Sequence, residues 1–138
     1  LSHGISYFNA ELLRLKSLLQ SVASCEKGSE GSPSLPTLII LDEILKGTNS
    51  LDKLNGSRLF LEYISHKNVT GVVATHDLEL SKMSENYPDR FHNYCFEIEL
   101  GKTVSYSYLV TKGVARNQNA TYLLREILNE AEDENKKM

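Results

Sequence analysis

The chain has 138 residues, of which 41% are hydrophobic and 24% are charged, and its net charge is −3 at pH 7. These proportions are typical of one globular domain and exclude a collagen-like fibre, a disulfide scaffold and disorder throughout. The acidic balance argues against a segment that contacts duplex DNA by itself, because such a segment needs a basic face.

Two further properties bear on the compartment. No apolar run approaches the roughly 18 to 20 residues that span a bilayer, and the first residues lack the pattern of a signal peptide. Cys25 and Cys95 have no metal-ligand spacing and are expected to be free thiols in a reducing environment. We therefore expect a cytoplasmic location and no membrane contact from this segment.

The first half of the chain alternates between helix and strand patterns. Apolar residues at steps of three and four predict an amphipathic helix over 5–24, with Ser6 as its N-cap. A loop rich in Gly, Ser and Pro follows over 26–36. The unbroken apolar run 38–41 predicts a strand that is buried on both faces, as in a parallel sheet.

The same alternation continues after a Gly-Thr-Asn-Ser turn. A second helix is predicted over 56–66, with an inward face made of Leu59, Phe60, Tyr63 and Ile64. Residues 69–75 predict a second buried strand, and a short helix over 77–85 is expected to have Asp77 as its cap. This order predicts an α/β fold with a parallel sheet.

The pattern then changes to a hairpin and a last helix. Two strands are predicted over 94–100 and 103–110, around Gly101 and Lys102. A helix is predicted over 119–131, with an apolar face, before a charged and frayed tail at 132–138. No internal repeat or domain boundary is visible, so 1–131 is expected to form one domain portion.

Polar residues follow both predicted strands of the sheet. Asp42 and Glu43 end the first strand and His76 follows the second. Ligands of open α/β sheets bind beyond the carboxyl ends of the strands. A strand that ends in Asp is the Walker B pattern, in which Asp holds Mg²⁺ and an adjacent Glu acts on water. The alternative is that Asp42 and Glu43 only cap a turn and that His76 is a surface residue.

Two other segments allow two interpretations each. Residues 47–52 read either as an ordinary turn or as a polar loop against a partner's nucleotide. Ser6 reads either as a simple cap or as a phosphate contact at a helix N-terminus. The sequence contains no Gly-x-x-x-x-Gly-Lys-Ser/Thr, so this chain has no P-loop of its own.

Four segments together resemble one family. Residues 41–50, Leu-Asp-Glu-Ile-Leu-Lys-Gly-Thr-Asn-Ser, resemble the Walker B motif and the following loop of the MutS family of DNA mismatch-repair ATPases. Residues 74–76, Ala-Thr-His, are similar to its strand end, and 6–11 to its Ser-Thr-Phe-x-x-Glu signature segment. Residues 112–117 resemble its Pro-Gly-Val/Ala-Ser segment. The four motifs occur in the family's order over nearly the whole chain.

The resemblance implies a fold and a role for each matching residue. The fold is the second half of an ABC-type P-loop NTPase domain, with the P-loop expected upstream of Leu1. Asp42 matches the Mg²⁺-associated Asp, Glu43 the catalytic carboxylate and His76 the switch His near the γ-phosphate of ATP. Ser6 matches the signature Ser that reaches the opposing subunit's nucleotide. The interface loop is matched by Thr48, Asn49, Ser50 and Asp52.

The resemblance also implies cofactors and partners. They are ATP and Mg²⁺, a homodimer of the intact protein, and DNA that is contacted through domains absent from this chain. The isolated chain is expected to lack appreciable ATPase activity because it has no P-loop Lys. Three departures place the parent among MutS-like relatives: Tyr7 replaces Thr, Leu45-Lys46 replaces Gly-Arg, and 52–56 replaces a shorter Asp-Gly turn. The alternatives are an ABC-transporter or SMC-type ATPase head and a non-catalytic dimerisation module.

Overall fold

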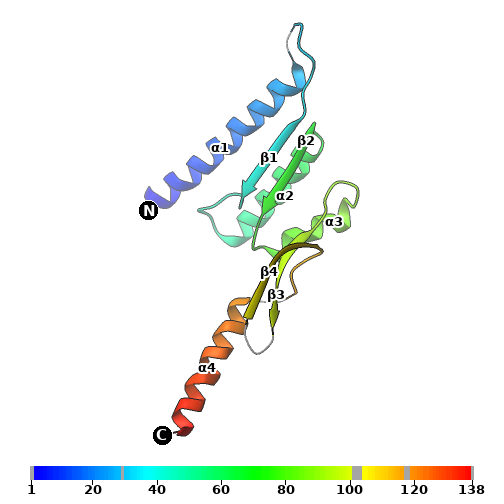
Figure 1. The fold of residues 1–138 in the computed structure, drawn as a ribbon. Coiled ribbons are helices and arrows are strands. Elements are labelled where there is room, and N and C mark those ends of the chain that lie inside the picture. Colours follow the sequence, from blue (N-terminus) through cyan, green and yellow to red (C-terminus); the bar gives the residue numbers. More distant parts are fainter. Residues whose placement is uncertain (1, 29, 101–103, 117–118, 138) are drawn as a thin grey trace. The chain divides into compact units, whose positions relative to one another are not determined.

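The computed structural model describes residues 2–28, 30–100, 104–116 and 119–137. It shows a mixed α/β chain that divides into two compact units, Leu1–Arg90 and Phe91–Met138, and each is described by itself. The elements of the first unit, drawn from blue to green in Figure 1, are α1 (Ser2–Lys27), β1 (Thr37–Asp42), α2 (Ser50–Ser65), β2 (Val69–Ala74), the 3₁₀ helix η1 (Leu78–Lys82) and α3 (Met83–Asn86).

The sheet of the first unit consists of β1 and β2. The two strands are parallel, with Thr37 opposite Val69 and Asp42 opposite Ala74. The predicted parallel pair is therefore confirmed over almost its predicted lengths. Because the strands are parallel, their carboxyl ends lie at the same edge of the sheet, and α2 forms the crossover between them.

Helix α1 is longer than predicted at both ends. It begins at Ser2, so Ser6 lies inside the helix and its prediction as the N-cap is wrong. Serine has a lower helix propensity than alanine by only a fraction of a kcal/mol, and it therefore does not need to mark a helix start. Among the described side chains of this helix, Leu15 and Val22, seven residues apart, are the buried ones.

Helix α2 begins six residues earlier than predicted, and its buried side differs. Ser57, Leu61 and Ile64 are buried at steps of four and three, whereas Leu59 and Tyr63 of the predicted inward face are exposed. Gly56, which the prediction placed at the helix start, lies inside α2 against the side chain of Leu45.

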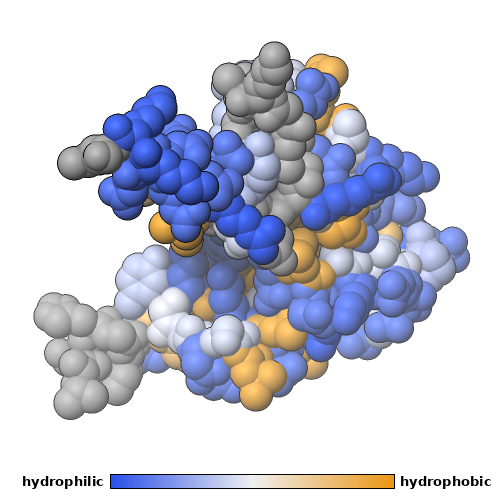
Figure 2. All heavy atoms as spheres, turned by 90° about the horizontal axis from the view of Figure 1, so that it is seen from below, coloured by the Kyte–Doolittle hydropathy of each residue, from blue (hydrophilic) through white to orange (hydrophobic). Residues whose placement is uncertain are grey.

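Among the described residues, only one side of the sheet is covered. Ile39 is 6% exposed, whereas its neighbour Ile40 is 73% exposed. The prediction that the strands are buried on both faces is therefore wrong within the described chain. Side chains alternate between the two faces along a strand, so Ile39 and Ile40 lie on opposite faces of the sheet. In the space-filling view of Figure 2, hydrophobic residues (orange) reach the surface between hydrophilic ones (blue).

The second unit contains a hairpin and a helix. Strands β3 (Tyr94–Leu100) and β4 (Val104–Lys112) are antiparallel, with Phe96 opposite Val110, which confirms the predicted hairpin; its turn lies outside the described residues. Helix α4 (Asn119–Lys137) continues through the segment predicted as a frayed tail. This segment is rich in Glu and Lys, which are good helix formers. None of the described helices is both long enough and apolar enough to cross a membrane.

Candidate functional site

The candidate site lies where β1 and β2 end. Asp42 is opposite Ala74, and the next residue, Glu43, donates its main-chain N–H to the carbonyl oxygen of Ala74 at 2.8 Å. This bond carries the strand pairing one residue past β1. The backbone thus brings Glu43 beside the Thr75-His76 segment, with Asp42 opposite Ala74.

The turn after β1 has an unusual backbone. Glu43 and Leu45 have φ angles of 63° and 58°, in the left-handed region that non-glycine residues seldom adopt. The residue between them, Ile44, is only 2% exposed, and Leu45 is also buried. Burial of these two side chains holds the turn in a conformation that costs on the order of 1–3 kcal/mol for each such residue. Strain of this kind is common at functional sites.

The carboxylate of Glu43 has three partners. Its Oε1 accepts a hydrogen bond from the main-chain N–H of His76 at 2.7 Å. Its Oε2 accepts one from the Thr75 hydroxyl at 3.3 Å and forms an ion pair with Nζ of Lys53 at 2.9 Å. These groups come from β2's end and from the first turn of α2. Glu43 therefore connects three segments of the unit.

The surroundings of Glu43 change its acidity. Partial burial raises the pKa of its carboxyl, but the ion-paired Lys53, the His76 N–H and the Thr75 hydroxyl act in the opposite direction. Their combined effect is larger, so the pKa lies below its ordinary value. Glu43 is consequently an anion at neutral pH, which is the form that can accept a proton from water.

Asp42 differs from Glu43 in its surroundings. Its side chain is exposed at the edge of the sheet. Within the described residues, no three His, Cys, Asp or Glu side chains are grouped as a ready-made metal site. Mg²⁺ commonly keeps several waters and binds through one or two carboxylates together with substrate phosphates. A single exposed Asp at a strand end fits that mode of binding.

His76 reaches Glu43 through its backbone. The hydrogen bond uses the main-chain N–H, and the residue itself is exposed. Thr75 organises this segment, because its hydroxyl also accepts a hydrogen bond from the N–H of Asp77 at 3.0 Å. Asp77 in turn caps η1 by accepting from the N–H of Glu79, as its predicted cap role requires. The imidazole of His76 is therefore available for contacts at the sheet edge.

The loop over 47–52 leads into α2. The Asn49 side chain accepts a hydrogen bond from the N–H of Asp52 at 2.9 Å, and its amide donates to the Asp52 carboxylate at 2.9 Å. Asn49 is therefore the N-cap of α2, and Ser50 is the first residue of the helix. Thr48 is half-buried just before them. Asn49 and Asp52 thus have a structural role in this loop, whatever else they bind.

The start of α1 lies against the same loop. Gly47 has φ 93°, and a Cβ placed on it would lie 2.5 Å from Cδ1 of Tyr7. The Tyr7 ring therefore contacts the turn that follows β1. This contact brings the chain around Ser6 close to the Gly47 turn, although the side chain of Ser6 is outside what the structure describes.

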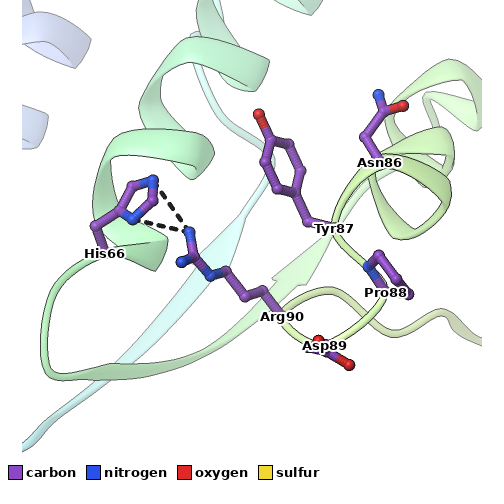
Figure 3. A pocket seen from close by; sticks show the side chains of 6 residues that line it. All are labelled: His66, Asn86, Tyr87, Pro88, Asp89 and Arg90. Carbon is purple, nitrogen blue, oxygen red and sulfur yellow. Dashed lines mark hydrogen bonds between the residues drawn. The ribbon is translucent and has the colours of Figure 1, made fainter.

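A shallow hollow lies elsewhere in the first unit. It has a volume of about 320 Å³ and is lined by His66, Asn86, Tyr87, Pro88, Asp89 and Arg90. Figure 3 shows the Arg90 guanidinium directed at the His66 ring, with Nη1 at 2.8 Å from Nδ1. None of the residues predicted for the site lines this hollow.

The sequence predictions missed two residues of the site. Lys53 was read only as part of a long turn, and Thr75 only as part of a motif. Nothing in the spacing of Lys53 indicated an ion pair with Glu43, because the pair depends on where α2 begins. The hydroxyl of Thr75, by contrast, had a signal, since a polar residue at a strand end lies next to the other strand end.

Comparisons with known proteins place these motifs in context. No family model matches the chain. Among curated proteins, the DNA mismatch repair protein MutS of Rickettsia canadensis (strain McKiel) is 36% identical over 81% of this chain and 11% of its own length. MutS of Aquifex pyrophilus is 30% identical over 84% of the chain and 12% of its own length. MutS of Caldicellulosiruptor bescii is 27% identical over 96% of the chain and 15% of its own length.

The chain is therefore a relative of DNA mismatch-repair proteins. More particularly, it is homologous to a segment of MutS, and this confirms the family that the four motifs indicated. The chain spans only about an eighth of the length of these relatives.

Proposed function

We propose that this chain is the C-terminal part of the ATPase region of a MutS-like DNA repair or recombination protein. The observation that carries the proposal is the joining of the two strand ends by Glu43, whose carboxylate binds the Thr75-His76 segment. The strained turn around Ile44 and the homology to MutS support the same assignment. The partial P-loop NTPase fold, with the phosphate cradle supplied from outside this chain, belongs to this proposal.

The proposed reaction is hydrolysis of ATP to ADP and phosphate. Glu43 accepts a proton from water, the water oxygen forms a bond to the terminal phosphorus, and the bond from that phosphorus to the ADP oxygen breaks. The exposed imidazole of His76 binds the terminal phosphate or orients the water. Asp42 would hold Mg²⁺, which supplies charge compensation on the phosphates when bound.

The remaining predicted residues are assigned to the dimer interface. Ser6 and the loop with Thr48, Asn49, Ser50 and Asp52 face the nucleotide of the opposing subunit in the intact protein. The contact of Tyr7 with Gly47 supports this assignment, because it brings the Ser6 segment close to the loop. DNA is contacted by domains outside this chain.

The substitution Glu43→Gln tests the proposal when it is made in the full-length protein that contains this chain. The amide keeps the shape of Glu43 but cannot accept the proton, so ATP turnover should fall by a factor of about 100 or more while ATP still binds. The chain alone should show no appreciable turnover. If the intact protein binds no Mg-ATP and dimerises regardless of nucleotide, the chain is a non-catalytic dimerisation module instead.

A further inference from the structure

The ion pair of Lys53 with Glu43 differs in its exposure from the ion pair of Lys82 with Glu79. The Nζ of Lys53 lies 2.9 Å from Oε2 of Glu43, and the two side chains are only 28% and 14% exposed. The pair between Lys82 and Glu79 has a similar distance, 2.8 Å, but both of its side chains are more than half exposed. Exposed pairs contribute little, whereas a partly buried pair that joins two segments fixes geometry.

The position of Lys53 follows from the cap of α2. Because Asn49 starts the helix, Lys53 falls in its first turn, and its main-chain N–H is bonded to the Asn49 carbonyl oxygen at 2.9 Å. A cation in the first turn is disfavoured by the helix dipole. The ion pair with Glu43 offsets that cost, so this placement indicates a role beyond helix formation.

The hydrogen bonds of the Glu43 carboxylate show how Lys53 contributes to its orientation. A carboxylate offers about four acceptor directions. The His76 N–H uses one on Oε1, while Thr75 and Lys53 use two on Oε2. The direction that remains, on Oε1, is where water can bind. Without Lys53, only the long 3.3 Å bond from Thr75 would hold Oε2, and the carboxylate could turn about its hydrogen bond to the His76 N–H.

We propose that Lys53 is a positioning residue for Glu43, which holds its carboxylate in the orientation that presents Oε1 to the attacking water. This inference rests on the proposed ATPase function. Lys53 touches neither the water nor the phosphate, and acts through Glu43 alone. It lies in the segment 52–56, where the sequence departs from the usual mismatch-repair turn.

ATP turnover of the full-length protein tests the proposal with Lys53→Met, Lys53→Arg and the control Lys82→Met. Lys53→Met should lower kcat about 10- to 100-fold, because a small misplacement of a catalytic group has effects of that size. Its KM for ATP should stay within about twofold. Lys53→Arg, which keeps the charge, should restore kcat to within about threefold of wild type, and Lys82→Met should not change it.

The outcomes separate this inference from the proposed function. If Glu43→Gln leaves turnover unchanged, the proposed function fails. If Glu43→Gln abolishes turnover while Lys53→Met has wild-type or higher kcat, only the role of Lys53 is overturned. A loss that Lys53→Arg does not relieve also overturns it.

A measurement on the chain itself covers the case of a poorly folded variant. The urea midpoint is compared for Lys53→Met in the wild-type and the Glu43→Gln background. The midpoint should fall more in the wild-type background, because only there does the substitution leave a partly buried carboxylate without its cation. Equal shifts in the two backgrounds would overturn the proposal.

Discussion

Gly47 and Gly31 have similar backbone conformations, but the atoms around them differ. Their φ angles are +93° and +86°, both disfavoured for residues with a Cβ. A Cβ at Gly47 would meet the Tyr7 ring, whereas none of the described atoms lies within 4 Å of a Cβ at Gly31. The two glycines therefore separate the cost of backbone strain from the cost of displacing a neighbour.

Gly47→Ala should destabilise the chain more than Gly31→Ala. We expect about 1–2 kcal/mol from strain at either position, and about 1–3 kcal/mol more at Gly47 from the displaced ring. Urea unfolding followed by circular dichroism measures both. Adding Tyr7→Ala should recover part of the loss at Gly47 only. Equal losses at the two glycines would mean that Tyr7 moves aside freely.

Glu43 should make the stability of the chain depend on pH. Its folded-state pKa lies below the ordinary value of 4.5, so its ion pair and hydrogen bonds stabilise the fold fully above that value. This stabilisation is lost as the pH falls through the lower, folded-state pKa. The difference in unfolding free energy between wild type and Glu43→Gln should therefore shrink between pH 7 and pH 3. A constant difference over that range would contradict the expectation.

Helix α2 depends on the residue that starts it. The Asn49 side chain satisfies the N–H of Asp52, which would otherwise have no partner within the helix. The same cap fixes the first turn, in which Lys53 lies. The start of this element thus affects both its own stability and the surroundings of Glu43.

Asn49→Ala should cost about 1 kcal/mol of unfolding free energy, and Asn49→Ser should cost much less, since serine is a comparable cap. Urea unfolding of the chain checks both variants. If a role in nucleotide binding is separate from capping, Asn49→Ser should lower nucleotide affinity in the intact protein while the chain stays stable. Equal destabilisation by alanine and serine would argue against the cap.

The order of the elements was predictable from the sequence, and their exposed faces were not. Apolar runs located both strands of the parallel sheet, strand-like runs around Gly101 and Lys102 located the hairpin, and apolar residues at helical spacing located the three long helices. The start of α2 was missed because Asn49, Asp52 and Gly56 are common in turns, and only the three-dimensional cap identifies Asn49 as the start. The polar residues at the strand ends pointed to Asp42, Glu43 and the Thr75-His76 segment as parts of one candidate site. Lys53 was missed because its pairing depends on tertiary structure.

At the scale of the whole molecule, the described chain has much apolar surface. On the sheet, Leu38, Ile40 and Val72 are exposed on the side opposite Ile39 and Leu41. On α4, Leu124, Ile127 and Leu128 are exposed as well. The buried side chains that the structure describes all belong to the first unit, in α1, β1, the turn that follows β1, α2, η1 and α3. Its stability therefore rests on a small core.

Substitutions of the neighbouring residues Ile39 and Ile40 test whether the inner face of the sheet is buried and its outer face is exposed. Ile39→Ala should lower the unfolding free energy of the chain by about 2–5 kcal/mol, because it empties a packed site. Ile40→Ala should change it by only about 0.5 kcal/mol, as surface substitutions usually do. Thermal and urea unfolding give the two values. A large loss for Ile40→Ala would show that the outer face of the sheet is covered in solution.

The bonds of Glu43 also have a consequence for the order of folding. Two of its partners, Thr75 and His76, are 32 and 33 positions further along the chain. Contacts between residues so distant in sequence form slowly, since a long loop must close first. The cap of α2 is local and can form early, with Lys53 already in place. The carboxylate then reaches its final orientation only when β2 has paired with β1, so Glu43 reports the pairing of these two strands.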